Sequence, residues 1–409
     1  MEHSNYNPES VGIEAVRPPQ EKKNPAHLPA IDGLRGLAAM MVVFFHAWGM
    51  NGFLLFPQFS LFGVAIPVYK LFTPGYSGVY LFFVLSGFCL SYPFLANPGR
   101  KDDWPGYALN RVRRILPPYL ISFVILFLIG QWLHQWQVLP GEKFLFEPFK
   151  TNRFIKELFL IQKSRVCASY WTLVLEWRWY LLFPALLILA RRVSPAIVVA
   201  VLYVIAYFAQ KPFFSGPLHN ATFLPLVTLL PVFAFGIWAA HLTARPRERL
   251  QRWERGLLKG PLWGLVAGLF WAVLLSPSVR PGETIKLATL WQLLQPMGVQ
   301  PPSWVGSSFE FAIVWGPLYF FLMLAALNHP GLRRIFGSKP FVKLGMVSYS
   351  IYLLQEPVIR AGHYFIDRPE HGPLRLLAHH YLLTPALCVL AGWAFYYIGE
   401  RPFLKRSKR

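Results

Sequence analysis

Residues 28–48 read LPAIDGLRGLAAMMVVFFHAW, and this stretch decides the fold. From Gly36 to Phe45 it carries no charge, and Arg35 and His46 stand at its two ends. On an α-helix that rises about 1.5 Å per residue, these two side chains start about 16 Å apart along the axis. In a membrane helix, Arg35 would lie near one interface and His46 inside the hydrocarbon core, which is about 30 Å thick. An ionisable group at that depth indicates a functional site, although a snorkelling arginine and a buried, hydrogen-bonded histidine would give the same pattern.

The composition is typical of a polytopic membrane protein. Of the 409 residues, 55% are hydrophobic and only 14% are charged, whereas soluble domains carry about 25% charged residues. The formal charge of +21 would suit nucleic acid, but the basic residues form short clusters between apolar runs and no nucleic-acid-binding motif accompanies them. We therefore predict no nucleic-acid partner. The three cysteines are too far apart in sequence to indicate a disulfide framework or a metal site.

The apolar runs predict an all-α, polytopic integral membrane protein with about ten transmembrane helices. The expected spans are roughly 34–50, 76–96, 115–133, 170–190, 194–210, 222–242, 260–276, 309–328, 343–365 and 376–399. The segment 52–72 is broken by prolines and a glycine, so we predict an interfacial or re-entrant course for it. Lys and Arg concentrate in the segments that face the cytoplasm if both termini are cytoplasmic, and we predict that orientation. Residues 1–27 are expected to be a disordered cytoplasmic tail without a cleavable signal peptide, and 405–409 a basic cytoplasmic tail.

Motifs of soluble enzymes, such as G-x-S-x-G, a P-loop or H-E-x-x-H, are absent from this sequence. A neutral His46 in a dry site can act as a general base toward a hydroxyl group, and the guanidinium of Arg35 can hold phosphate. Arg111, Arg113 and Arg114 precede a predicted span on the same side. They either set the topology or form an anion site with Arg35.

A second polar group lies in the predicted span 170–190. Thr172, Glu176 and Tyr180 are spaced at i, i+4 and i+8, so they share one helix face. Glu176 is expected at a depth similar to that of His46, where its carboxylate could orient the imidazole. An ion pair between Glu176 and Arg178 is the alternative, although residues two apart point away from each other on a helix.

Further polar residues lie in the span 343–365. Ser348, Tyr349 and Gln355 either hold helices together or line a pocket, and Glu356 beside Pro357 can face a cavity. We predict no metal site; zinc at the histidines near the last outer loop is the alternative. These histidines are His363, His371, His379 and His380.

Five sequence blocks resemble the membrane-bound acyltransferase-3 family. They are Asp32-Gly-Leu-Arg35-Gly with His46 after it, 78–88 with Ser86-Gly87, Arg111-x-x-Arg114-Ile-x-Pro117-x-Tyr119, Trp171-Thr172 with Glu176 and Tyr180, and Leu344-Gly with Ser348-Tyr349 and Tyr352. A terminal Glu400-Arg-Pro402-Phe403 also fits. The resemblance implies an acyltransferase transmembrane domain over 28–404. It implies an acyl-CoA donor, expected to be acetyl-CoA, that enters from the cytoplasm, and no bound cofactor. The implied acceptor is a carbohydrate, glycolipid, secondary metabolite or other hydroxylated molecule at a cell membrane, expected to be the bacterial inner membrane.

The resemblance also assigns expected roles to site residues. The expected catalytic residues are His46 and Glu176, and the expected donor-binding residues are Arg35, Arg111 and Arg114. The expected substrate pocket consists of Ser86, Thr172, Tyr180, Ser348, Tyr349 and Gln355. Gln355 stands where the family commonly has histidine, which argues against a second catalytic histidine. Trp177 and Arg178 stand where the family commonly has polar residues, which suggests an unusual acceptor or acyl chain. The rival interpretation is a transporter or flippase that uses the same polar residues as a substrate path. A receptor-like binding protein is the third interpretation. Hydrolysis or transfer of acyl-CoA by the purified protein would distinguish an acyltransferase from a transporter.

Overall fold

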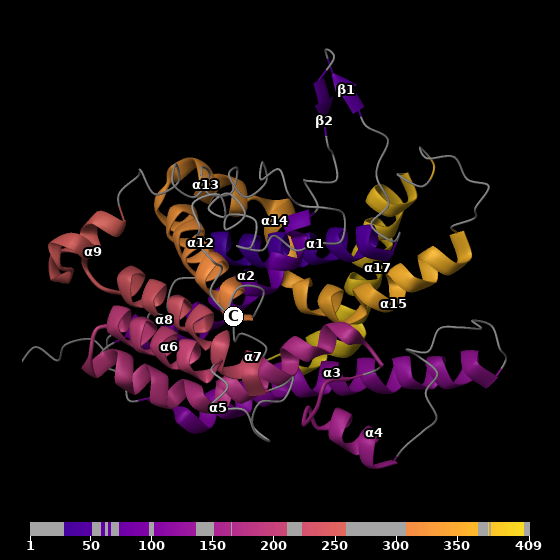
Figure 1. The fold of residues 1–409 in the computed structure, drawn as a ribbon, viewed down its shortest axis with the longest axis horizontal. Helices are drawn as coiled ribbons and strands as arrows, with labels where there is room; N and C mark the ends of the chain where they lie inside the picture. Colours follow the sequence, from indigo (N-terminus) through magenta and orange to yellow (C-terminus); the bar gives the residue numbers. More distant parts are fainter. Residues whose placement is uncertain are drawn as a thin grey trace, which may run out of the picture.

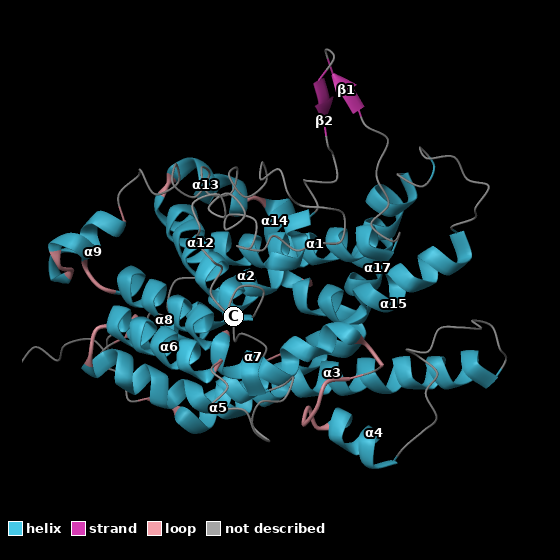
Figure 2. Ribbon diagram, viewed as in Figure 1, coloured by secondary structure: helices cyan, strands magenta, loops and turns pink. Residues whose placement is uncertain are grey.

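The computed structural model folds the apolar runs into helices. It describes residues 28–50, 59–61, 64–66, 73–97, 102–135, 151–164, 166–210, 223–258, 308–366, 375 and 378–404. Within these ranges the secondary structure is helical apart from one two-stranded hairpin (Figure 2). The predicted tails, 1–27 and 405–409, lie outside the described residues.

The first half of the chain contributes the helices that carry most of the predicted site residues (Figure 1). In order, the elements are α1 (Pro29–Met50), β1 (Phe59–Leu61), β2 (Val64–Ile66), η2 (Thr73–Ser77), α2 (Gly78–Leu95), α3 (Trp104–Gln135), α4 (Thr151–Leu158), η3 (Ala168–Tyr170), α5 (Trp171–Arg192) and α6 (Pro195–Ala209). The strands β1 and β2 pair antiparallel, with Leu61 opposite Val64, and project beyond the helices (Figure 1). They fall within 52–72, where the sequence predicts an interfacial or re-entrant segment.

The second half continues with helices only, among the residues described. They are α7 (Phe223–Thr228), α8 (Leu230–Ala244), η5 (Arg247–Arg249), α9 (Arg252–Leu257), α12 (Ser308–Asn328), α13 (Pro330–Phe336), α14 (Lys339–Met346), α15 (Ser348–Ile366), η7 (His379–Leu383), α17 (Thr384–Phe395), η8 (Tyr396–Glu400) and η9 (Arg401–Phe403).

Six helical segments in the described part are long and apolar enough to cross a membrane. They are Pro29–Gly49, Pro74–Leu95, Trp104–Trp132, Ala168–Arg192, Leu224–Ala244 and His379–Phe403. The helices α12 and α13 bend by 97° at their junction and make a seventh if they form one span. The structure thus supports a multi-pass membrane protein, while the total of about ten spans and the cytoplasmic termini stay predictions.

The remaining predicted spans differ from these segments for identifiable reasons. The span 260–276 lies outside the described residues. The helix α6, which corresponds to 194–210, has only 15 residues. The span 343–365 is divided between α14 and α15, and α15 carries Gln355, Glu356 and Arg360, which reduce its hydropathy. These polar groups are hydrogen-bonded inside the bundle, as described below.

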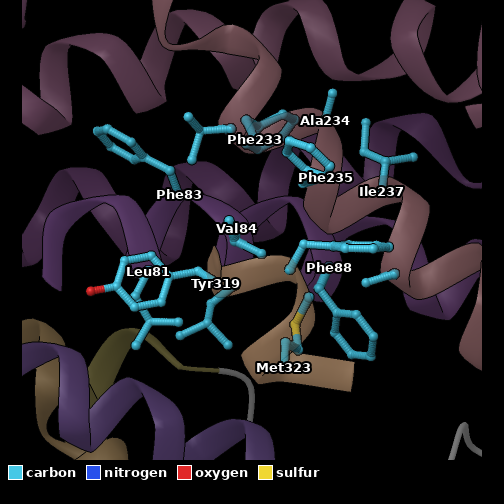
Figure 3. Packing of buried hydrophobic residues seen from close by; sticks show 14 of the residues in the cluster. Leu81, Phe83, Val84, Phe88, Phe233, Ala234, Phe235, Ile237, Tyr319 and Met323 are labelled. Carbon is cyan, nitrogen blue, oxygen red and sulfur yellow. The ribbon is translucent and has the colours of Figure 1, made fainter. Parts of the chain in front are cut away.

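The core is centred on α2, which packs on α8 and α12. Figure 3 shows Val84 of α2 between Phe233 and Phe235 of α8 on one side and Tyr319 of α12 on the other. The two helices α2 and α8 meet through glycines, because a Cβ at Gly87 would overlap the backbone carbonyl of Phe233. Small residues permit this close approach between membrane helices, where van der Waals packing drives association.

The Arg35 end of α1 is fixed in the same way. A Cβ at Gly33 would overlap the carbonyl of Phe336 in α13, and one at Gly345 of α14 would overlap the carbonyl of Asp32. Because α13 and α14 hold the first turns of α1 by backbone contact, the position of Arg35 is set by the fold. Farther along, α1 packs on α15 and α17.

Candidate active site

A cavity of about 100 Å³ lies at the Arg35 end of α1, between α1, α2, α3, α5 and α15. Its polar lining consists of Arg35, Ser86, Cys89, Arg111, Arg114, Thr172, Glu176, Tyr180, Ser348, Tyr349 and Tyr352. Nine of the eleven predicted site residues therefore meet in one cavity. The two that do not line it are His46 and Gln355.

Helical spacing explains how the lining is assembled. Thr172, Glu176 and Tyr180 project from one face of α5 into the cavity, as their i, i+4, i+8 spacing predicts. Arg111 and Arg114, three residues apart on α3, also face it, whereas Arg113 between them is exposed and does not line it. The arginine cluster thus divides into two cavity residues and one surface residue.

The cavity carries an excess of positive charge. Among the residues that the structure describes, three guanidinium groups and a single carboxylate, that of Glu176, line it. Arg35 lies 3.7 Å from Asp32, but Arg111 and Arg114 form no ion pair with any described residue. Arg111 Nε is buried and has no hydrogen-bond partner among those residues. Because buried guanidinium groups are normally paired, this arrangement suits an anionic ligand.

Glu176 is held by neighbours on its own side of the cavity. Tyr180 Oη donates to Glu176 Oε2 at 2.5 Å, and Ser86 Oγ lies 3.0 Å from Tyr180 Oη. The alternative ion pair with Arg178 is not formed, since Arg178 donates instead to the backbone carbonyls of Val174 and Ile161. The carboxylate therefore faces the three arginines without an ion pair to any of them.

His46 lies at the opposite end of α1. Its side chain is partly exposed, and Nδ1 is 2.9 Å from Oε1 of Gln355. The pairing predicted between His46 and Glu176 is not formed. The residue of the α5 segment that reaches this end is Ser169, and Glu176 lies seven residues, about 10 Å, farther along the helix axis. The depth estimated from sequence was too coarse to resolve this difference.

A hydrogen-bonded group of side chains surrounds Gln355, and together with His46 it is called the His46 group below. Gln355 Nε2 donates to Ser169 Oγ at 2.7 Å, and Ser169 donates to Glu356 Oε2 through Oγ at 3.1 Å and through its backbone N–H at 2.9 Å. Cys167 Sγ donates to the same oxygen at 3.3 Å, while Arg360 donates to Oε1 at 3.1 Å.

Sequence reasoning missed Ser169 and Cys167 and gave Glu356 only a general role. One signal was readable, because a carboxylate inside a membrane protein needs a partner and Arg360 stands four residues after Glu356. The contact with Ser169 had no such signal, because Ser169 belongs to a different helical segment.

The cavity and the His46 group are joined through Tyr352. Tyr352 Oη donates to the backbone carbonyl of Ser169 at 2.7 Å and lies 2.7 Å from Thr172 Oγ1. Thr172 and Tyr352 both line the cavity, so this pair marks its end nearest to His46. Ser169, which holds Gln355, is thus in direct contact with the cavity wall.

Several histidines gather on α15 and η7. The ring centroids of His379 and His380 are 4.8 Å apart, and those of His363 and His380 are 6.4 Å apart. Among the residues that the structure describes, no group of three histidine, cysteine, aspartate or glutamate side chains is arranged to hold a metal ion. His371 lies outside the described residues.

Comparison with known proteins places the chain among membrane acyltransferases. The sequence profile of a family described as an acyltransferase domain matches residues 28–398. The chain belongs to the acyltransferase-3 family. The resemblance found in the sequence blocks is thereby confirmed, and the match covers nearly all of the predicted domain at 28–404.

Individual relatives are similar over most of the chain. Acyltransferase MdmB of Streptomyces mycarofaciens is 27% identical, over 82% of this chain and 80% of MdmB. The O-acetyltransferase OatA of Staphylococcus aureus is 22% identical, over 94% of this chain but only 58% of OatA. Both relatives are named as acyl-transferring enzymes, which supports an acyltransferase family function for this chain.

Proposed function

We propose that this protein is an integral membrane O-acyltransferase that moves an acyl group, expected to be acetyl, from acyl-CoA to a hydroxyl group. The observation that carries the proposal is the cavity in which Arg35, Arg111 and Arg114 surround space without forming ion pairs across it. Coenzyme A is a multiply phosphorylated molecule, and guanidinium groups bind phosphate through several charge-assisted hydrogen bonds. Membership of an acyltransferase family supplies the reaction class.

The cavity lined by Arg35, Arg111 and Arg114, called the donor cavity below, lies along the same face of α1 as His46. His46 lies eleven positions after Arg35, which corresponds to a rotation of about 20° beyond three full helical turns, so both side chains project from the same face. A donor with its nucleotide at the arginines can extend its thioester arm along this face. In this proposal the Arg35 end faces the cytoplasm, where coenzyme A is found, and the protein lies in a bacterial inner membrane.

The chemistry is a proton-assisted attack on a thioester. His46 Nε2 takes the proton of the acceptor hydroxyl while the hydroxyl oxygen attacks the carbonyl carbon of the thioester. The carbon–sulfur bond then breaks, the acyl group stays on the acceptor oxygen, and the leaving thiolate receives the proton from the imidazolium. General-base assistance of this kind contributes about 10²- to 10⁴-fold in rate.

Glu176 acts in the donor cavity in this proposal. Its carboxylate is fixed by Tyr180 and faces the arginines, where it limits their mutual repulsion before the donor binds. The acceptor approaches His46 from the other side of the Thr172–Tyr352 pair. We propose a carbohydrate, a glycolipid or another hydroxylated molecule as the acceptor.

The test is transfer by purified protein in liposomes. Labelled acetyl-CoA is supplied with a lipid and glycan extract of the native membrane, and both thiol release and acceptor labelling are followed. We expect His46→Ala to reduce transfer to a few per cent of wild type while donor binding persists. His363→Ala, a partly buried histidine on α15 that does not contact His46, should stay within twofold. Uptake of labelled solute without hydrolysis or transfer would overturn the proposal in favour of a transporter.

A further inference from the structure

The imidazole of His46 is oriented by a chain of side chains rather than by a direct carboxylate. The chain runs from His46 through Gln355 and Ser169 to Glu356, with successive contacts of 2.9, 2.7 and 3.1 Å. Gln355 and Ser169 are buried, and Glu356 is buried with Arg360 as its ion-pair partner. Because each member is held by the next, the position of the amide of Gln355 is determined by this network.

The direction of each hydrogen bond can be worked out from the far end. The carboxylate of Glu356 is paired with Arg360, so it only accepts hydrogen bonds. Ser169 must therefore give its single hydroxyl proton to Glu356, which leaves a lone pair of Oγ toward Gln355. Only the NH₂ group of Gln355 can satisfy that lone pair, so its carbonyl oxygen must face His46.

A carbonyl oxygen can only accept a hydrogen bond. The nitrogen that faces it, His46 Nδ1, must therefore carry the proton in the neutral imidazole. Nε2 is then unprotonated, and it has no hydrogen-bond partner among the described residues. The charged groups that act electrostatically on the imidazole are Glu356 and Arg360, both on α15, and they are paired with each other.

We propose that Gln355 is a positioning residue that fixes His46 in the Nδ1–H tautomer, and that Ser169 and Glu356 set the orientation of its amide. The inference rests on the proposed function, in which Nε2 accepts the proton of the acceptor hydroxyl. In acyl-transfer sites that use histidine as base, a third group commonly orients the ring. Here an amide takes that position, and a serine next to the wall of the donor cavity holds the amide.

The experiment reads the tautomer directly. Full-length protein with ¹⁵N-labelled histidine is placed in nanodiscs, and the His46 signals are assigned by their loss in His46→Ala. We expect the nitrogen shifts of wild-type His46 to show a protonated Nδ1 and an unprotonated Nε2. The spectrum of the wild-type protein decides this first measurement, and His46→Ala serves only to assign the signals. An Nε2–H tautomer in the wild-type protein would overturn the inference.

Two variants test the chain of hydrogen bonds from Glu356 through Ser169 and Gln355 to His46, called the relay below. Gln355→Ala removes the acceptor, and Ser169→Ala removes the group that prevents the amide from turning. Each should move His46 toward the Nε2–H tautomer and lower kcat about 10- to 100-fold, as expected for loss of a hydrogen bond to a group that becomes charged in the reaction. Donor affinity should change less than twofold, because the cavity arginines are untouched.

Two controls separate positioning from structural damage. Ser169→Thr retains the hydroxyl and should retain the wild-type tautomer. Ser350→Ala removes a buried hydroxyl on α15 that donates to Glu400 rather than to this group, and it should leave the tautomer unchanged. If Gln355→Ala and Ser169→Ala keep both the tautomer and kcat, Gln355 has no positioning role. If His46→Ala retains transfer, the proposed base is wrong, whereas the tautomer shift in the relay variants would still be measurable.

Discussion

Replacing Arg111 with alanine should weaken donor binding without harming the empty protein. Arg111 Nε is buried without a hydrogen-bond partner among the described residues, and no carboxylate there pairs with the side chain. Its substitution therefore breaks no hydrogen bond or ion pair among the described residues, and it removes one of three like charges that line the cavity. We expect thermal unfolding of the unliganded variant to occur at the wild-type temperature or above it.

The loss of binding affinity for acyl-CoA in Arg111→Ala can be estimated. A hydrogen bond that involves a charged group contributes about 1.5–3 kcal/mol, so the dissociation constant of acyl-CoA should rise roughly 10- to 150-fold. A truncated thioester that lacks the nucleotide offers no phosphate to Arg111. Its binding should change less than about twofold.

The assay compares two arginines of the same helical turn. Arg113→Ala removes an equal charge from an exposed position that does not line the cavity. Donor titrations by isothermal calorimetry, with acyl-CoA and with the truncated thioester, are run on Arg111→Ala, Arg113→Ala and wild type after the membrane orientation has been checked by cysteine labelling. Equal losses for both thioesters at Arg111, or equal losses at Arg111 and Arg113, would refute the phosphate site. The first result would indicate a general change in the cavity and the second a long-range effect of charge.

Two further predictions concern the cavity and the core. Glu176→Gln removes the only carboxylate among the described residues that line the cavity, so acyl-CoA and free CoA should bind about three- to tenfold more tightly in the same titrations. A hundredfold loss of kcat with unchanged affinity would instead restore the predicted support of His46 by Glu176. Gly87→Ala places a Cβ against the carbonyl of Phe233 and should destabilise the protein by about 1–3 kcal/mol, measured by thermal unfolding in detergent. Gly256→Ala in α9, where a Cβ would meet nothing within 4 Å, should be neutral or stabilising, and equal destabilisation by both would contradict close α2–α8 packing.

The sequence predicted those parts of the site that depend on spacing within one helix. Thr172, Glu176 and Tyr180 share a face because of helical periodicity, and that face is the one that lines the cavity. Arg111 and Arg114 could be grouped with Arg35 because their spans end on the same side. The same reasoning predicts the apolar spans, since the thickness of a bilayer sets their length.

Contacts between distant segments were not predictable in this way. His46 meets a residue 309 positions away, and Gln355 meets one 186 positions away. These contacts depend on how α15 packs against α1 and η3, and the residue pattern within a single helix does not encode that packing. The depth of each helix is uncertain by about one helical turn at the sequence level, so the relative depth of two helices is uncertain by about two turns. Ser169 and Glu176 lie seven residues, about two turns, apart, and such an estimate cannot tell which of them is the neighbour of the His46 group.

The distribution of satisfied and unsatisfied polar groups along α1 argues for where the substrates bind. Burying a polar group without a partner is costly, so buried polar groups in proteins are nearly all hydrogen-bonded. Between the arginines and His46, the groups on α5 and α15 follow this rule, with Tyr180 bonded to Glu176 and Tyr352 bonded to Ser169. Among the described residues on this path, Arg111 Nε at one end is buried without a hydrogen-bond partner, and Nε2 of the partly exposed His46 at the other end has none either. One is a donor that suits a phosphate oxygen and the other an acceptor that suits a hydroxyl proton, and a molecule that brings a phosphorylated donor to a hydroxylated acceptor satisfies both.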